Sequence, residues 1–494
     1  MKSSARPRVA SPGVPAATPR AARLAGGGAG TWRRLTPARK AAELLLWLLL
    51  LLPPWYASAA AKDSFRLPKL MLSEWLAVAS LVPLVWGLRQ VERIDLAAVW
   101  RLPAVRAALP LLIVATFGLA TSAHPLHVRE GLTDMWIGGA CLVGWSLGVA
   151  DGRLSRLLGG LVIPGVVLAV IGILQFHGVQ SLPLAGVHAG SRFAITSRAG
   201  NPGDLGAFLV LPCLAAQWQL ARSPLTPRRR ALLAAALALC IYGLLLTQTF
   251  AAIAALLLGS LLFWALALRR GSAGIRRLAI GVAAVAILVA LSVTAVPALR
   301  ARVAEKLGQA AHGDWNAVLT GRFDGWRTAV WMLGQHPLAG VGQGAYRAEF
   351  VPAKLALIGH GAVFFSGQQQ NFVNAHDELL EVAADCGLPG LLALAWGLGV
   401  LALALRSRLA AARPRRRAPA EATADAAAAA GDPLAGRRID AAFGVAGAAA
   451  VGALALVDFP FRIALVAFPA LLLLAWILRP DIAVGAVGAV GEAA

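Results

Sequence analysis

Charged residues are scarce in this sequence. They make up 14% of its 494 residues, whereas a soluble globular domain contains about 25%. Acidic residues are scarcer than basic ones, with 24 Asp and Glu compared with 46 Lys and Arg. With 58% hydrophobic residues and a mean hydropathy of +0.69, the composition argues against a row of soluble domains. It predicts one polytopic membrane bundle.

Cysteine is rare too, and the chain has no phosphate-binding loop. The four cysteines lie in or beside apolar runs, at Cys141, Cys213, Cys240 and Cys386. They lack metal-ligand spacing and are expected to be small core residues. The glycine-rich stretch from Gly340 to Gly344 lacks the preceding strand that nucleotide binding requires, so we expect a turn between two loop helices. Glu378, Glu381 and Asp385 recur at helical spacing, where polar packing or sugar binding is favoured over a cation site.

The basic excess is explained by the membrane. A net charge of +22 could indicate nucleic-acid binding, but the basic residues fall mainly in the N-terminal tail and in short loops. Four Arg-rich loops lie at residues 89–106, 222–230, 269–277 and 406–438. The positive-inside rule assigns these loops to the cytoplasm. We therefore expect membrane lipids, and no nucleic acid, as partners.

Apolar runs that are long enough to cross a membrane recur along the chain. After a first run at 44–52, they lie at 72–89, 107–121, 131–150, 157–176, 203–221, 231–248, 250–269, 278–297, 377–405, 441–458 and 463–478. Ala57-Ser-Ala59 resembles a signal-peptidase site, but the long basic region before it favours an uncleaved first helix. The sequence thus predicts an all-α fold with about twelve transmembrane helices.

The order of these runs predicts the domain organisation and one large extracytoplasmic loop with short helices. The predicted segments are a disordered basic cytoplasmic tail at 1–40, transmembrane helices 1–9 at 41–297, the large loop at 298–376, transmembrane helices 10–12 at 377–480 with a cytoplasmic linker at 406–440, and a second cytoplasmic tail at 481–494. The tail and the linker are assigned from their composition, which has no apolar periodicity.

His376 is the first candidate functional residue. It stands at the end of the large loop, directly before the chain turns hydrophobic. An ionisable group at such a boundary is a functional candidate, and an imidazole can accept a hydroxyl proton at neutral pH. Asn374 and Asp377 could orient the ring. The alternative is a solvated loop histidine without a chemical role.

Arginines on the outer side form the second candidate set. Arg322, Trp326 and Val330 share one face of a predicted helix at the membrane surface. A guanidinium binds phosphate oxygens with two parallel donors; the alternative is an arginine that snorkels to lipid headgroups. Arg192 and Arg198 lie in another outer loop, against the positive-inside trend, so they either hold an anionic donor or are simply solvated.

Motifs in and after the large loop resemble a bacterial superfamily of O-antigen ligases, O-antigen polymerases and protein O-oligosaccharyltransferases. The motifs are Arg322-x-x-x-Trp326; His336-Pro337-Leu-Ala-Gly340-Val-Gly342-Gln-Gly344; His376-Asp377 followed by nine residues and Gly387-Leu-Pro-Gly390; and Asp458-Phe-Pro-Phe461. Their order and spacing together carry the resemblance, which is strongest over residues 322–390.

The resemblance implies an O-antigen ligase-like membrane glycosyltransferase. It would move a glycan from undecaprenyl diphosphate to a lipid A–core acceptor, at the periplasmic face of a bacterial inner membrane, with both chain termini in the cytoplasm. It implies metal-independent transfer with no cofactor, His376 as the base and Arg322 on the diphosphate. A polymerase and a protein O-oligosaccharyltransferase stay open as alternatives. A transporter would also explain the spans, but it predicts paired broken helices and midplane charges.

Two positions depart from the family pattern. Asp377 stands where the ligases have Asn, Ser or Gln. The family often has Ser-Arg-Gly at the start of an outer helix, where this chain has Thr249-Phe250-Ala251. If a phosphate-binding arginine is missing there, Arg192, Arg198 or Arg347 must replace it.

Overall fold

The structure is a computed structural model that describes residues 37–58, 60–61, 63–88, 96–179, 189–222, 225–268, 293–365, 371–412 and 433–480. These residues form helices and connecting turns, with no strand among them, so the all-α prediction is confirmed. Several predicted segments lie outside the described residues: most of the N-terminal tail, most of the span at 278–297, the middle of the linker at 406–440, and the C-terminal tail.

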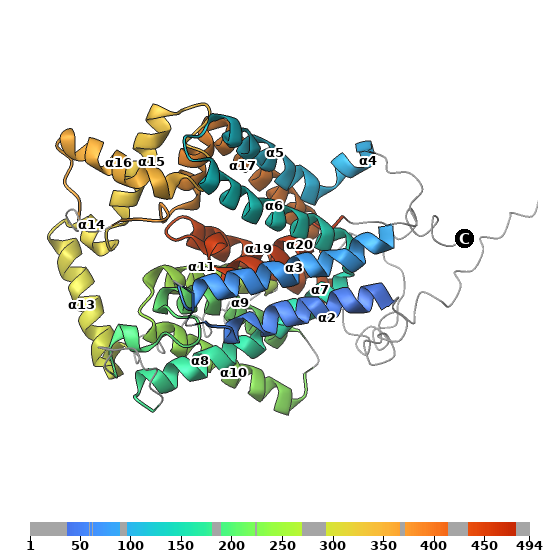
Figure 1. Cartoon of the computed structure of the whole chain (residues 1–494). Coiled ribbons are helices and arrows are strands. Elements are labelled where there is room, and N and C mark those ends of the chain that lie inside the picture. The colour runs from blue at the N-terminus through green and yellow to red at the C-terminus, as the bar shows by residue number, and fades with distance from the viewer. Residues whose placement is uncertain are drawn as a thin grey trace, which may run out of the picture.

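The first half of the chain supplies most of the bundle (Figure 1). Its helices are α2 (Pro37–Leu51), η2 (Pro53–Trp55), α3 (Arg66–Leu88), α4 (Leu96–Arg101), α5 (Pro103–Thr121), α6 (Pro125–Gly148), α7 (Asp151–Gly160), α8 (Val162–Phe176), η3 (Arg192–Ala194), α9 (Pro202–Ala221), α10 (Pro227–Leu246) and α11 (Phe250–Ala267). Proline opens several of them, because the first helical residue needs no N–H partner. Asn201 caps α9 by accepting a hydrogen bond from the Gly203 amide at 2.6 Å.

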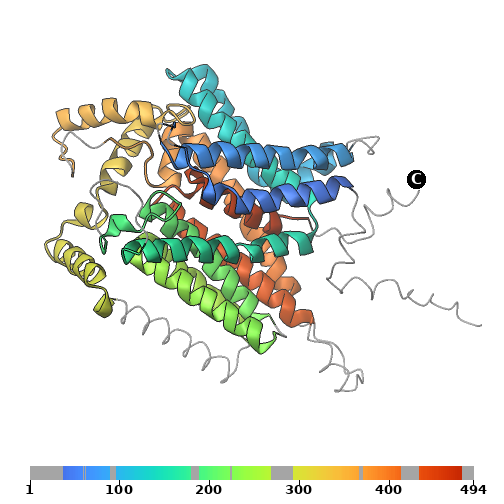
Figure 2. The same ribbon diagram turned by 60° about the horizontal axis from the view of Figure 1, so that its bottom comes forward.

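The second half adds a group of short helices at one end of the bundle and completes the bundle itself. Its helices are α13 (Pro297–Ala311), α14 (Trp315–Val318), α15 (Arg322–Gln335), α16 (Tyr346–Gly359), α17 (Glu378–Ala411), α19 (Pro433–Ala455), η4 (Pro460–Arg462) and α20 (Ala464–Ile477). Figures 1 and 2 show α13 to α16 gathered at one end of the bundle, opposite the end that carries α4. The described residues of the predicted large loop thus form short helices. We call α13 to α16 the outer domain, after the side of the membrane on which the sequence predicts them.

Eight helices among the described residues are long and apolar enough to cross a membrane. They are Arg66–Trp86, Pro103–Thr121, Asp151–Phe176, Pro202–Ala221, Pro227–Leu246, Phe250–Ala267, Glu378–Ala411 and Leu434–Ala455. The chain is therefore an integral membrane protein, but the predicted count of twelve is not confirmed. Three predicted spans among the described residues are not in this set, and they correspond to α2, α6 and α20. Helices α2 and α20 are short, and the first half of α6 carries charged residues.

Several predicted boundaries differ from the observed ones. Helix α2 begins at Pro37, inside the predicted tail, and α17 and α19 extend into both ends of the predicted linker. Helix α19 ends at Ala455, short of the predicted boundary at 458. The Asp458 carboxylate and Pro460 follow that end, and neither favours continuation of a helix in lipid.

Small residues let the membrane helices approach closely, as expected where lipid removes the usual hydrophobic drive. A Cβ atom at Gly259 of α11 would lie 3.1 Å from the Ala446 carbonyl oxygen of α19. Helix α9 runs through the centre, and its Trp218 stacks on Phe443 with ring centroids 4.6 Å apart. This packing fixes α19 against α9 and α11, and the C-terminal end of α19 leads to the candidate site.

The outer helices share a second hydrophobic core with the outer ends of α5, α6 and α17. Its buried members include Ala115, Val128, Leu132, Met332, Val341, Tyr346 and Phe350. Inside it, the Tyr346 hydroxyl donates to the Gly325 carbonyl at 3.0 Å and fixes α16 against α15. The outer domain is therefore anchored to the bundle by buried side chains.

Candidate active site

The glycine-rich turn between α15 and α16 is docked onto membrane helix α17. The Asp385 carboxylate accepts hydrogen bonds from the amides of Gly344 at 2.6 Å and Tyr346 at 3.0 Å. Gly340 has φ +65°, and a Cβ atom there would lie 2.3 Å from the Asp385 backbone. Only glycine fits so close an approach in this conformation. The turn predicted between two loop helices is confirmed, and its role is structural.

Helix α17 is interrupted where this turn meets it. Gly387 has φ +65° and ψ −164°, which breaks the helical path. The Leu388 amide donates to the Pro337 carbonyl at 2.8 Å, and a Cβ atom at Gly387 would lie 2.7 Å from that oxygen. The spacing between His376 and Gly387 is thus the length of the first segment of α17, from its start to the docked turn.

His376 stands immediately before that first segment. Its backbone has φ +58°, and the Trp326 indole donates to its carbonyl oxygen at 3.3 Å. The imidazole lies between Phe372, at 5.1 Å and 86°, and Phe459, at 4.7 Å. The side chain is 23% exposed. The ring is therefore held by aromatic neighbours but still reaches solvent.

Asp458 is the carboxylate beside this ring. Its Oδ1 lies 3.7 Å from His376 Nδ1, an ion-pair distance rather than a hydrogen bond, and Nδ1 is buried without a hydrogen-bond partner among the described residues. Burial alone would raise the pKa of Asp458, but the adjacent His376 and Arg322 outweigh burial, and its pKa is lowered. The carboxylate therefore stays ionised at neutral pH.

The two residues expected to orient the ring bind elsewhere. Asp377 caps α17 and accepts hydrogen bonds from the amides of Leu379 and Leu380, both at 2.9 Å. Asn374 donates to Glu381 Oε1 at 3.0 Å. An aspartate at a helix start satisfies free amides, which explains why Asp377 points away from the imidazole.

Glu381 holds the segment that leads into His376. Its carboxylate also accepts from the Ala375 amide at 2.9 Å and from Arg462 at 3.1 Å, and its side chain is 3% exposed. Together with Asn374, three donors satisfy this buried carboxylate. Polar packing is therefore its role here, and the described residues contain no group of three or more His, Cys, Asp or Glu side chains suited to a metal ion.

Arg322 points toward the site rather than toward lipid. Its Nε donates to the Val457 carbonyl at 2.5 Å and its Nη1 to the Leu319 carbonyl at 3.0 Å. Burial lowers the pKa of Arg322, whereas Asp458 opposes this shift. These bonds to backbone carbonyls do not fit an arginine that snorkels to headgroups, and they leave further N–H donors of the guanidinium available.

Three more cations gather around Arg322, and two of them were not recognised in the sequence. Burial lowers the pKa of Arg192, and the charges of Arg302 and Arg322 lower it further. Lys306 has a lowered pKa for the same reasons. Among the described residues, Arg302 is the one member of this group with an acidic side chain at ion-pair distance, Glu305 at 2.8 Å. Arg302 and Lys306 lie on α13, where their sequence is typical of an ordinary surface helix.

Arg192 also reaches the start of α11. Its Nε donates to the Thr247 carbonyl at 3.3 Å, three residues before Phe250, where the family pattern has an arginine. Arg198 donates instead to the Trp55 carbonyl at 3.3 Å, and Arg347 pairs with Glu130 of α6. Of the three candidates for the missing arginine, only Arg192 is brought to Arg322.

Comparison with known proteins identifies one domain. Residues 235–395 match a family model described as O-Antigen ligase, and none of the curated proteins matches the chain. The matched segment includes Arg322, Trp326 and His376, whereas Arg192 and Asp458 lie outside it. The family resemblance drawn from the motifs is confirmed by this match.

Proposed function

From the O-antigen ligase domain at residues 235–395, whose family consists of glycan-transferring enzymes, we propose that this protein transfers a glycan from undecaprenyl diphosphate to a lipid A–core-type acceptor at the periplasmic face of a bacterial inner membrane. The acceptor hydroxyl oxygen bonds to the anomeric carbon as the bond from that carbon to the diphosphate oxygen breaks. The observation that carries the proposal is the His376 imidazole, 3.7 Å from the Asp458 carboxylate and next to an arginine cluster.

In this mechanism His376 removes the acceptor proton. With Nδ1 facing Asp458, Nε2 is the nitrogen that takes the proton from the hydroxyl. The ionised Asp458 stabilises the positive charge that then develops on the ring, because opposite charges attract strongly where water is largely excluded. Asp458 itself stays unprotonated, as the carboxylate of a catalytic triad does. The aromatic contacts of Phe372 and Phe459 keep the ring in place.

The cation cluster is proposed to hold the diphosphate. Arg192, Arg302, Lys306 and Arg322 repel one another in the absence of an anion, as the lowered pKa values of Arg192 and Lys306 indicate. An anionic group relieves this repulsion, and the relief grows as negative charge develops on the leaving diphosphate. We assign to Arg192 the role of the arginine absent at Phe250, since its guanidinium reaches Thr247 beside that helix start.

A deletion strain tests the proposal. A ligase predicts loss of all chains from the lipid A–core acceptor and accumulation of lipid-linked polymer, restored by the wild-type gene but not by His376→Ala. A single attached repeat would instead indicate a polymerase, and loss of glycan only from proteins a protein O-oligosaccharyltransferase. Unchanged surface glycans, together with lost uptake of a solute, would contradict a transferase altogether.

A further inference from the structure

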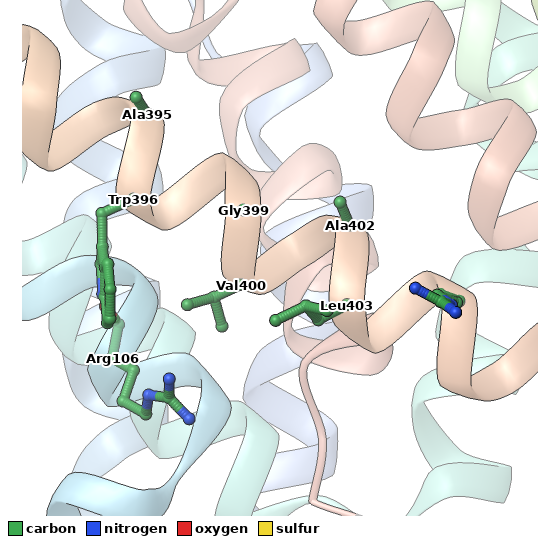
Figure 3. A pocket seen from close by; sticks show the side chains of 8 residues that line it. Arg106, Ala395, Trp396, Gly399, Val400, Ala402 and Leu403 are labelled. Atoms are coloured by element: carbon green, nitrogen blue, oxygen red, sulfur yellow. The ribbon is translucent and has the colours of Figure 1, made fainter.

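A pocket of about 500 Å³ lies at the seam between α5 and α17, far along α17 from His376. Its wall is apolar and includes Trp396, Val400 and Leu403, while Arg106 and Arg406 supply its polar edge. Figure 3 shows the Arg106 side chain beside Trp396, extending along the pocket below Val400. The pocket thus combines an apolar wall with two cationic side chains.

The two guanidiniums have few partners of their own. Arg106 lies over the Trp396 ring at 5.5 Å, and the Trp396 indole donates to its backbone carbonyl at 2.9 Å. Within the part of the chain that the structure describes, neither Arg106 nor Arg406 has a side-chain hydrogen bond or an ion pair. Cationic groups at an apolar surface are costly unless an anion or water meets them.

The position of the pocket points to the cytoplasmic leaflet. Arg106 lies at the end of α5 that follows an Arg-rich loop, and Arg406 lies near the end of α17 that precedes another. The positive-inside rule assigns both helix ends to the cytoplasm, where the leaflet carries anionic lipid. The outer cation cluster is at the opposite end of the bundle, so the two sites are separate.

We propose that this pocket binds an anionic glycerophospholipid of the cytoplasmic leaflet. Its phosphate lies between Arg106 and Arg406, and an acyl chain covers Val400 and Leu403. A soluble anion would leave the apolar wall uncovered. A zwitterionic lipid would bring an ammonium group toward two arginines. Because a Cβ atom at Gly397 would lie 2.7 Å from the Ala107 carbonyl oxygen, α5 and α17 touch beside the pocket, and a bound lipid braces this contact.

Lipid binding is measured on the full chain in nanodiscs and in detergent. Phosphatidylglycerol is titrated against phosphatidylcholine, and bound lipid is counted by native mass spectrometry, with the Tm followed in parallel. We expect retained phosphatidylglycerol and a raised Tm for the wild type, since a ligand of the folded state stabilises it. In Arg106→Gln/Arg406→Gln, affinity should fall about tenfold or more, because each arginine near an anionic lipid contributes about 1 kcal/mol. Arg228→Gln/Arg230→Gln removes the same charge from exposed positions of α10 and should bind like the wild type.

A second pair of variants blocks the pocket without removing a charge. A Cβ atom at Gly399 meets nothing within 4 Å, and the same is true of Gly452 in α19. A side chain can therefore start at either position without a clash at Cβ, but only Gly399 lines the pocket, so Gly399→Leu is the variant that fills it. Gly399→Leu should therefore lose phosphatidylglycerol while Gly452→Leu retains it. Equal retention by Gly399→Leu and Gly452→Leu, equal losses in the two arginine doubles, or equal binding of phosphatidylcholine by the wild type would each overturn the proposal.

Discussion

Oδ1 of Asp458 lies 3.7 Å from Nδ1 of His376, although His376 precedes α17 and Asp458 follows α19. The approach depends on two helix ends. Asp377 caps α17 directly after His376, and α19 ends at Ala455, so that Asp458 is free of the helix. The pair therefore exists only when α17 and α19 are packed side by side.

Replacing His376 tests the proposed base. His376→Ala should lower the rate of glycan transfer by about 10²–10⁴-fold, the usual effect of removing a general base, without loss of the folded protein. The measurement is transfer from a lipid-linked donor in membranes with matched protein amounts. His360→Ala, an exposed histidine of the same outer domain, is the control and should be near normal. Activity within a few-fold of the wild type would remove His376 from the mechanism.

Replacing Asp458 tests the carboxylate beside the ring. Asp458→Asn keeps the shape of the side chain but removes its charge, so the positive charge that develops on His376 loses its stabilising partner. We expect transfer to fall by about tenfold or more, since two opposite unit charges about 4 Å apart near a protein surface attract by about 4 kcal/mol. Asp314→Asn, at the cap of α14, is the matched control.

The same variant has a pH signature. The folded-state pKa of Asp458 is lowered, below the value of about 3.9 in an unfolded chain. Asp458 therefore contributes stability above that unfolded value, and this contribution is lost as the pH falls through the folded pKa. The Tm advantage of the wild type over Asp458→Asn should be present at neutral pH and shrink in acid. An advantage that grows in acid would contradict the assigned charge state.

Two arginines of one outer loop provide an internal comparison. Arg192→Ala should weaken use of the lipid-linked donor, seen as a raised KM for the donor, because Arg192 is the residue brought to Arg322. Arg198→Ala should have a small effect, since Arg198 is bound to the Trp55 carbonyl. The reverse order of effects would transfer the diphosphate role to Arg198.

Membrane orientation can be tested with single cysteines. The native cysteines Cys141, Cys213, Cys240 and Cys386 are all buried, so their labelling background is low. A Cβ atom meets nothing within 4 Å at Gly359 of α16 or at Gly436 of α19. With the outer domain outside, Gly359→Cys should react with an impermeant thiol reagent in intact spheroplasts, and Gly436→Cys only after lysis. The opposite pattern would invert the orientation.

The sequence predicted what depends on local pattern. Hydropathy predicted most spans, and motif order led to His376 and Arg322, which lie in one domain. The sequence pattern did not predict which carboxylate lies beside His376. Asp377 is its chain neighbour, but its carboxylate satisfies helix amides, whereas Asp458 arrives through tertiary packing. Arg302 of α13 was missed for a similar reason, because only the folded chain brings it to Arg192.

The last prediction concerns the geometry of Arg322. Its Nε and Nη1 hold the Val457 and Leu319 carbonyls, and the remaining donors are proposed to bind the diphosphate. A lysine keeps the charge but has one compact ammonium in place of a planar fork, so it cannot hold both carbonyls and a phosphate.

Arg322→Lys should therefore lose transfer about as strongly as Arg322→Ala, by about ten- to hundredfold. Arg327→Lys, an exposed arginine of the same helix, should be near normal. Since Arg322 also contacts Val457, beside Asp458, the Tm of each variant is measured along with transfer. Loss of transfer with an unchanged Tm supports phosphate recognition. Near-normal transfer by Arg322→Lys would leave Arg192 and Arg302 as the leading diphosphate ligands.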